Sequence, residues 1–106
     1  MRIPSCLKVG AFEYQVICGH VFRERSDLFG QCDHDCFEIR LCSEHSGVPF
    51  CEARLSEVFL HEVIHAVEEV FLPSDSRLSE SQVELLSKGL LLVLRENKLT
   101  FLGGDS

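Results

Sequence analysis

His61, Glu62 and His65 form the pattern H-E-x-x-H, whose residue types and spacing point more directly to chemistry than any other stretch of this chain. Two histidines four residues apart on a helix present both imidazoles on one face, at a separation that a single Zn²⁺ ion can bridge. The glutamate between them is placed to hydrogen-bond a zinc-bound water, take its proton during attack and pass it to the leaving amine. The pattern therefore predicts a catalytic zinc site with Glu62 as the general base.

A catalytic zinc site needs a third protein ligand and one open position. Glu80 and Glu84 are both candidates, because they are four residues apart and project from one side of a second predicted helix. Glu80 lies in the first helical turn, where the helix dipole favours an ionised carboxylate. Glu84 lies one turn deeper and is better shielded from water. Periodicity does not choose between them, and Asp75 is a weaker candidate because it lies in a loop.

The first helix is predicted from Cys51 or Glu52 to Phe71, and Pro73 blocks its extension. An apolar stripe along it indicates that most of its surface is packed. The stripe consists of Leu55, Val58, Phe59, Val63, Ile64, Val67 and Val70.

The second helix is predicted to begin after Ser79, which is a suitable N-cap, with Gln82 completing a capping box. It is expected to extend to about Asn97. Its expected buried face consists of Val83, Leu86, Leu90, Leu91 and Leu94. Residues Lys98 to Leu102 form a short apolar end that we expect as a last strand.

The N-terminal half is predicted to form strands. Leu7 to Val21 contains alternating apolar residues and glycines, which predicts a strand or a bent hairpin. Leu28–Cys32 and Cys36–Cys42 are expected to form a hairpin around a polar turn, and Ser43–Pro49 a polar connection. Because strands come first and helices follow, the predicted fold is α+β, with a small antiparallel sheet packed against two main helices.

Size and charge limit the possible functions. With 106 residues, the chain is expected to form one domain, residues 1–106, around one core. A formal charge of −7 disfavours nucleic-acid binding and docking on anionic membranes, since both need a basic surface. No apolar run approaches a membrane span, and no secretory signal is evident at the N-terminus, so we expect a cytoplasmic protein.

Six cysteines require an interpretation in a chain of this length. In the cytoplasm we expect free thiols, several of them buried as small apolar side chains. Cys32 and Cys36 flank the predicted turn, with His34 and Cys42 nearby, so a second metal site or a disulfide is conceivable. Their spacing matches no zinc-ribbon pattern, which makes an ordinary hairpin the better interpretation.

The segment Leu60–Val67 resembles the active-site helix of gluzincin-type zinc metallopeptidases. Glu80–Ser87 is similar to the third-ligand helix of compact ImmA/IrrE-type peptidases. This resemblance implies a zincin-like minimal domain with Glu80 as the third ligand, although Glu84 then occupies a position usually held by asparagine. Residues 28–97 as a whole are similar to small metallopeptidases encoded by phages and bacteria.

The resemblance also exposes a gap. Many gluzincins use a histidine, tyrosine or arginine to stabilise the oxyanion, but this chain offers only Lys88, Arg95 and Lys98 after Glu84, and its one tyrosine is Tyr14.

The leading hypothesis is a zinc-dependent metallopeptidase that cuts a protein or peptide substrate. The second is a non-catalytic zinc-binding interaction module of phage or bacterial origin, and the third is a metal-free scaffold stapled by cysteines.

Overall fold

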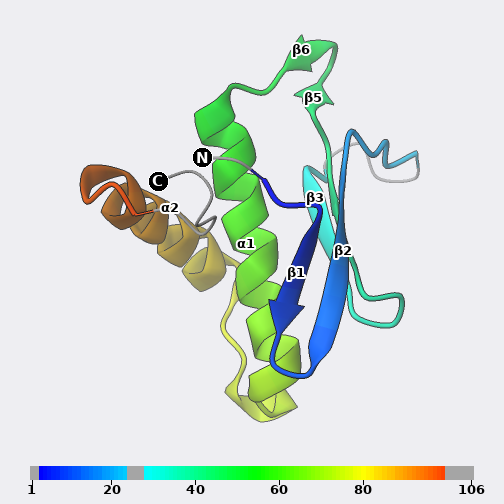
Figure 1. Ribbon diagram of the computed structural model, residues 1–106, viewed down its shortest axis with the longest axis vertical. Helices are drawn as coiled ribbons and strands as arrows, with labels where there is room; N and C mark the ends of the chain where they lie inside the picture. The colour runs from blue at the N-terminus through cyan, green and yellow to red at the C-terminus, as the bar shows by residue number, and fades with distance from the viewer. Residues whose placement is uncertain (1–2, 24–27, 100–106) are drawn as a thin grey trace.

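The structure, a computed structural model, describes residues 3–23 and 28–99. These residues form a four-stranded sheet, a separate two-stranded sheet and two long helices, which confirms the predicted α+β class (Figure 1). The elements are β1 (Cys6–Val9), β2 (Phe12–Cys18), β3 (Gly30–Asp33), β4 (Glu38–Leu41), β5 (Glu44–His45), β6 (Val48–Pro49), α1 (Glu52–Phe71), the short 3₁₀ helix η1 (Ser74–Ser76) and α2 (Glu80–Glu96).

The larger sheet is mixed, so the prediction of an antiparallel sheet is wrong. Its strand order is β1-β2-β4-β3, with two antiparallel hairpins joined through the parallel pair β2 and β4. Each hairpin has the local turn chemistry expected of it. Gly10 has a φ of 60° between β1 and β2, and the Asp33 carboxylate accepts a hydrogen bond from the Cys36 amide (3.1 Å) between β3 and β4. The parallel pair is a nonlocal contact that carries no such local signal.

Helix α1 lies against one face of the four-stranded sheet, and the main core is formed between them (Figure 1). The fully buried members with the largest side chains are Tyr14, Ile39, Leu41 and Phe59. The helix ends as predicted, because Leu72 is already extended and Pro73 follows it. Residues Ser43–Pro49, expected as an irregular connection, contain the small β5–β6 hairpin.

Helix α2 packs on the side of α1 away from the sheet (Figure 1). The predicted capping box is present: the backbone N–H of Gln82 donates to Ser79 Oγ, and the backbone N–H of Ser79 donates to Gln82 Oε1. The predicted buried face is partly wrong, because Leu86 and Leu90 are 51% and 41% exposed. The residues of α2 that are buried are Val83, Ser87 and Leu91.

The predicted last strand, Lys98–Leu102, lies only partly within the described residues. Lys98 has a φ of 55° and belongs to a turn, and Leu99 is not in a strand, while residues 100–102 lie outside the described ranges.

Over residues 3–23 and 28–99, the helices are too short or too polar to cross a bilayer. All six cysteines are free thiols.

Candidate metal centre

Helix α1 presents His61 and His65 on the same face, as their four-residue spacing predicts. Their Nε2 atoms lie 3.2 Å apart, and both side chains are about one quarter exposed. The two rings meet edge to face, with centroids 4.9 Å apart. Both histidines thus direct the same nitrogen toward a common point at the protein surface.

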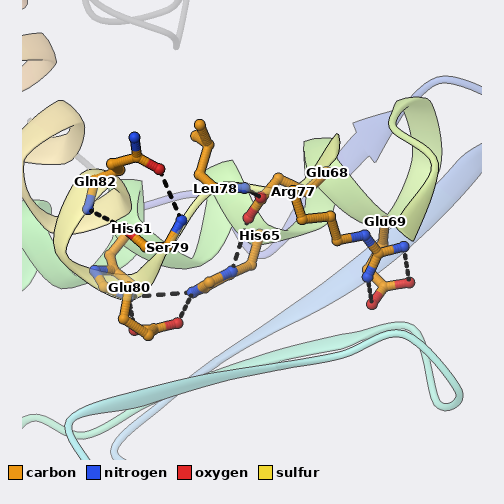
Figure 2. Close-up of polar contacts among 9 residues, drawn as sticks. All are labelled: His61, His65, Glu68, Glu69, Arg77, Leu78, Ser79, Glu80 and Gln82. Carbon is orange, nitrogen blue, oxygen red and sulfur yellow. Dashed lines mark hydrogen bonds and ion pairs between the residues drawn. The ribbon is translucent and has the colours of Figure 1, made fainter. Parts of the chain in front are cut away.

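Glu80 directs its carboxylate to that same point from α2 (Figure 2). Its Oε2 lies 3.2 Å from Nε2 of His61, and its Oε1 lies 2.8 Å from Nε2 of His65. The capping box at Ser79 begins the helix immediately before Glu80, so the local sequence fixes where this carboxylate emerges.

The three side chains fit a divalent metal ion. One ligand atom from each can be chosen so that all lie within 4.8 Å of one another. In a tetrahedral zinc site with metal–ligand distances near 2.0–2.1 Å, neighbouring ligand atoms are about 3.3 Å apart. The two imidazole Nε2 atoms are 3.2 Å apart, close to this value, and Glu80 places Oε2 at 3.2 Å from His61 and Oε1 at 2.8 Å from His65.

Hydrogen bonding to His65 supports the same interpretation. Its Nδ1 lies 3.0 Å from Oε1 of Glu68, and because a carboxylate only accepts, Nδ1 carries the proton. When the ring is neutral and Nδ1 carries its proton, Nε2 carries a lone pair, and this lone pair faces the Glu80 carboxylate and the His61 ring. Such a convergence of electron-pair donors is favourable only with a proton on an imidazole nitrogen or a metal cation among them.

Sequence analysis missed Glu68, which is 3% exposed and links His65 to the chain segment before α2. While Oε1 accepts from His65, Oε2 accepts a 2.6 Å hydrogen bond from the Leu78 amide (Figure 2). A neighbouring bidentate ion pair joins Glu69 to Arg77, with distances of 2.7 Å and 3.3 Å. The signal was available, since Glu68 follows His65 by three residues and therefore lies on the same helical face.

Glu62 is almost completely buried, with only 6% of its surface exposed. Burial, together with the nearby charge of Glu80, raises its pKa to about 8, and a hydrogen bond from the Cys32 backbone opposes this shift. Gly30 makes the burial possible, because a Cβ there would lie 2.8 Å from Val58 Cγ1 and 3.1 Å from Glu62 Oε2. Strand β3 therefore lies directly over the glutamate of the motif.

An open cleft of about 460 Å³ leads to this group. Residues 28–32 line one side of it, and side chains of α1 and the first turns of α2 line the other. The lining includes His61, Glu62, His65 and Glu80. Arg54 contributes a cation, but it lies over the Phe29 ring, 4.9 Å from the ring centroid. The arrangement can hold a metal ion beside a buried carboxyl group at the bottom of a solvent-filled cleft.

Two other carboxylates considered as ligands lie apart from the trio. Glu84 lines the same cleft but lies 3.5 Å from Lys88, and it does not belong to the group of converging ligand atoms. Asp75 is exposed in η1, where Ser76 Oγ lies 3.4 Å from its carboxylate. Of the three candidates for the third ligand, the structure thus brings only Glu80 to both histidines.

Tyr14 and Arg95, two of the candidate oxyanion donors, are not among the residues that line the cleft, whereas Cys32 is. Tyr14 is fully buried and its hydroxyl bonds to His34 Nδ1, while Arg95 lies 3.8 Å from Glu52. Within the described part of the chain, Cys32, Cys36 and Cys42 do not form a group of metal-ligating atoms.

Comparison with known proteins leaves the site to be interpreted from its own geometry, since no family model, no curated protein and no solved structure matches the chain.

Proposed function

We propose that this protein is a small zinc-dependent peptidase that hydrolyses a protein or peptide substrate. The observation that carries the proposal is the convergence of the Glu80 carboxylate on Nε2 of both His61 and His65. These three side chains are the proposed zinc ligands, which leaves one position open as catalytic sites require. The resemblance to gluzincin-type and ImmA/IrrE-type peptidases agrees with this ligand set.

A bound zinc ion would supply Lewis-acid chemistry, polarising a substrate carbonyl, making water a stronger nucleophile at neutral pH and favouring the ionised form of Glu62. Glu62 is the proposed general base. Its carboxylate takes a proton from water as the water oxygen bonds to the carbonyl carbon, and returns that proton to the amine when the C–N bond breaks. In the metal-free protein burial beneath β3 raises the pKa of Glu62 to about 8, and the charge of a bound zinc ion would lower it toward the range in which a general base is ionised at neutral pH.

The edge of β3 is the proposed binding surface for the substrate backbone. This strand is the last in the sheet order and lines the cleft. The hydrogen bond from the Cys42 amide to the Phe29 carbonyl sets an alternation in which Gly30 and Cys32 turn their backbone groups away from β4. The Cys32 N–H already donates to Glu62, so an extended peptide can pair with the Gly30 backbone groups and the Cys32 carbonyl while its scissile bond lies over the histidines.

The metal content of purified protein tests the ligand assignment. Wild-type protein is expected to hold about one zinc per chain, as is Glu62→Gln. His61→Ala and Glu80→Gln should hold much less. Glu84→Gln is the matched control, because it removes a carboxylate one turn along the same helix and outside the trio. Equal zinc loss in the two α2 variants, or an empty wild-type site with zinc in excess, contradicts the proposal.

Hydrolysis of a peptide library tests the catalytic step separately. The wild-type protein should cleave, and Glu62→Gln should retain zinc but lose cleavage. A Glu62→Gln protein that cleaves at the wild-type rate rules out its role as general base.

One observation favours a second candidate, the non-catalytic zinc-binding interaction module. Among the described residues lining the cleft, the only permanently charged cation is Arg54, which lies against Phe29 and 3.9 Å from Glu57. A site without a free oxyanion donor lacks a large part of the usual rate enhancement. Zinc at one per chain without cleavage of any peptide, together with unfolding on chelation, selects this candidate.

A further inference from the structure

The surface of α2 opposite α1 is apolar, although a helix with a single packed face is expected to be polar there. It consists of Leu85, Leu86, Gly89, Leu90, Leu92 and Val93, which we call the outer face. Its five large side chains are each between 41% and 68% exposed. The charged residues in the middle of α2 lie together on one flank: Glu84, Lys88 and Arg95.

We propose that the outer face of α2 binds the outer face of a second copy of this chain, forming an antiparallel pair of helices that cross at Gly89. The proposal is independent of the metal centre, since no member of the outer face lines the cleft.

The order of residues along α2 supports pairing of this face with itself. Leu85 and Leu86 lie four and three residues before Gly89, and Leu92 and Val93 lie three and four residues after it. A two-fold axis through Gly89 therefore places Leu85 and Leu86 of each copy opposite Leu92 and Val93 of the other. Self-complementarity of this kind is what a two-fold interface requires.

Gly89 suits the crossing point. Apart from the backbone of its own helix, no atom within residues 3–23 and 28–99 would lie within 4 Å of a Cβ added there, so no contact in that part of the chain accounts for a glycine at this helical position. Without a side chain, two helix backbones can approach each other closely at this residue. A second copy thus gives a reason for a residue that otherwise only weakens α2.

The size and charge of the face also suit a second copy. Its apolar side chains expose on the order of 500 Å² per chain, so two facing copies can bury at most about 1,000 Å² from these side chains, which is the lower size limit of specific interfaces. The face carries no charged side chain, so a partner surface must be apolar as well. The chain itself supplies such a surface.

Sedimentation equilibrium of the full chain tests the proposal. The wild-type protein should dimerise at concentrations up to about 100 μM, as interfaces of this size often bind in the micromolar range or tighter. Leu86→Glu should be monomeric while its circular dichroism is unchanged. Val48→Glu is the matched control, because Val48 is an exposed apolar residue on β6 and its change should leave the dimer intact. A monomeric wild type, or a dimer that Leu86→Glu does not weaken, overturns the proposal.

Gly89→Gln separates association from folding. Glutamine is a better helix former than glycine, so the folded monomer should be at least as stable as the wild type. Its side chain lies at the crossing, so the dissociation constant should rise by about tenfold or more, which corresponds to the steric cost of one poorly fitting interface residue. Unchanged dimerisation would place the contact elsewhere.

The direction of pairing has its own test. In the antiparallel arrangement residue 86 of one copy faces residue 92 of the other. The double variant Leu86→Lys with Leu92→Glu should therefore dimerise at least about tenfold more tightly than Leu86→Lys alone, since opposite charges then face each other across the axis. A double variant no tighter than the single one overturns the antiparallel arrangement.

Discussion

The two long helices serve one site but are held in different ways. Helix α1 is covered by the sheet on one side and by α2 on the other, and it carries the histidine pair, Glu62 and Glu68. Helix α2 packs mainly on α1 and leaves its outer face exposed, yet it supplies Glu80. The position of Glu80 therefore depends on the polar contacts at the start of α2 and on the packing of Val83 against α1, whereas the histidines lie on a helix that is packed on both sides.

The largest difference between the helices is expected in their contribution to stability. Phe59→Ala on α1 removes a fully buried ring from the main core and should lower the free energy of unfolding by about 3–5 kcal/mol. Leu85→Ala on α2 should change it by about 0.5 kcal/mol or less in dilute solution, because Leu85 is 68% exposed. Urea denaturation measures both. If the two variants lose comparable free energy of unfolding, the two helices do not differ in their contribution to stability.

Glu62 gives α1 a dependence on pH in the metal-free protein. Because the folded pKa is raised from 4.5 to about 8, the folded chain keeps a proton that the unfolded chain releases. The free energy of unfolding should therefore fall as the pH rises through this window, by on the order of a few kcal/mol, and level off above it.

Glu62→Gln, which does not titrate, is the control for this pH dependence. Urea denaturation of metal-free protein at a series of pH values should show the difference in stability between variant and wild type growing from pH 4.5 to 8. A difference that stays constant across the window means that Glu62 is ionised throughout.

The connection between the helices is expected to control metal affinity. Glu68→Gln replaces one of two accepting oxygens by a donor, so either His65 or the Leu78 amide loses its partner. Zinc affinity should fall about 10- to 100-fold, as for other partners that orient metal-bound histidines. Glu69→Gln is the matched control, since within the described ranges Glu69 forms its ion pair with Arg77 and not with His65 or Leu78, and competition with a chelating dye measures both. Equal effects would show that general loosening of the segment, not orientation of His65, sets affinity.

Two glycines should respond to alanine with opposite signs. Gly30→Ala forces a Cβ against Val58 and Glu62, which should destabilise the fold by about 1–3 kcal/mol. Gly89→Ala places a Cβ with no atom of the described residues within 4 Å apart from the backbone of its own helix, and should stabilise the fold by up to about 1 kcal/mol. Thermal unfolding at low concentration compares them, and a stabilising Gly30→Ala contradicts the close contact between β3 and α1.

Local signals in the sequence predicted the elements well. The N-cap at Ser79, the stop at Pro73 and the turn at Asp33 each depend on residues a few positions apart, and all are in the structure. The parallel pairing of β2 with β4 could not be predicted, because it joins segments more than 20 residues apart that no single turn connects. The apolar residues of α2 were recognised, but periodicity does not say which of two apolar faces meets α1.

In the candidate site, too, local spacing could be predicted from the sequence, whereas contacts between helices could not. The spacing of His61 and His65 predicts their common face, but the choice between Glu80 and Glu84 needed the angle at which α2 crosses α1. Glu68 was missed because the H-E-x-x-H pattern ends at His65, three residues before it. Zinc itself, the peptidase activity and the substrate stay predictions.

The carboxylate bridge from His65 through Glu68 to the Leu78 amide has a practical consequence. Any change in electron density on the imidazole alters how strongly Glu68 accepts the amide proton, and the NMR chemical shift of that proton is sensitive to hydrogen-bond strength. Leu78 is itself outside the metal-ligating trio. Its amide resonance thus offers a built-in reporter of metal loading that needs no attached probe, no substrate and no knowledge of what the protein cuts.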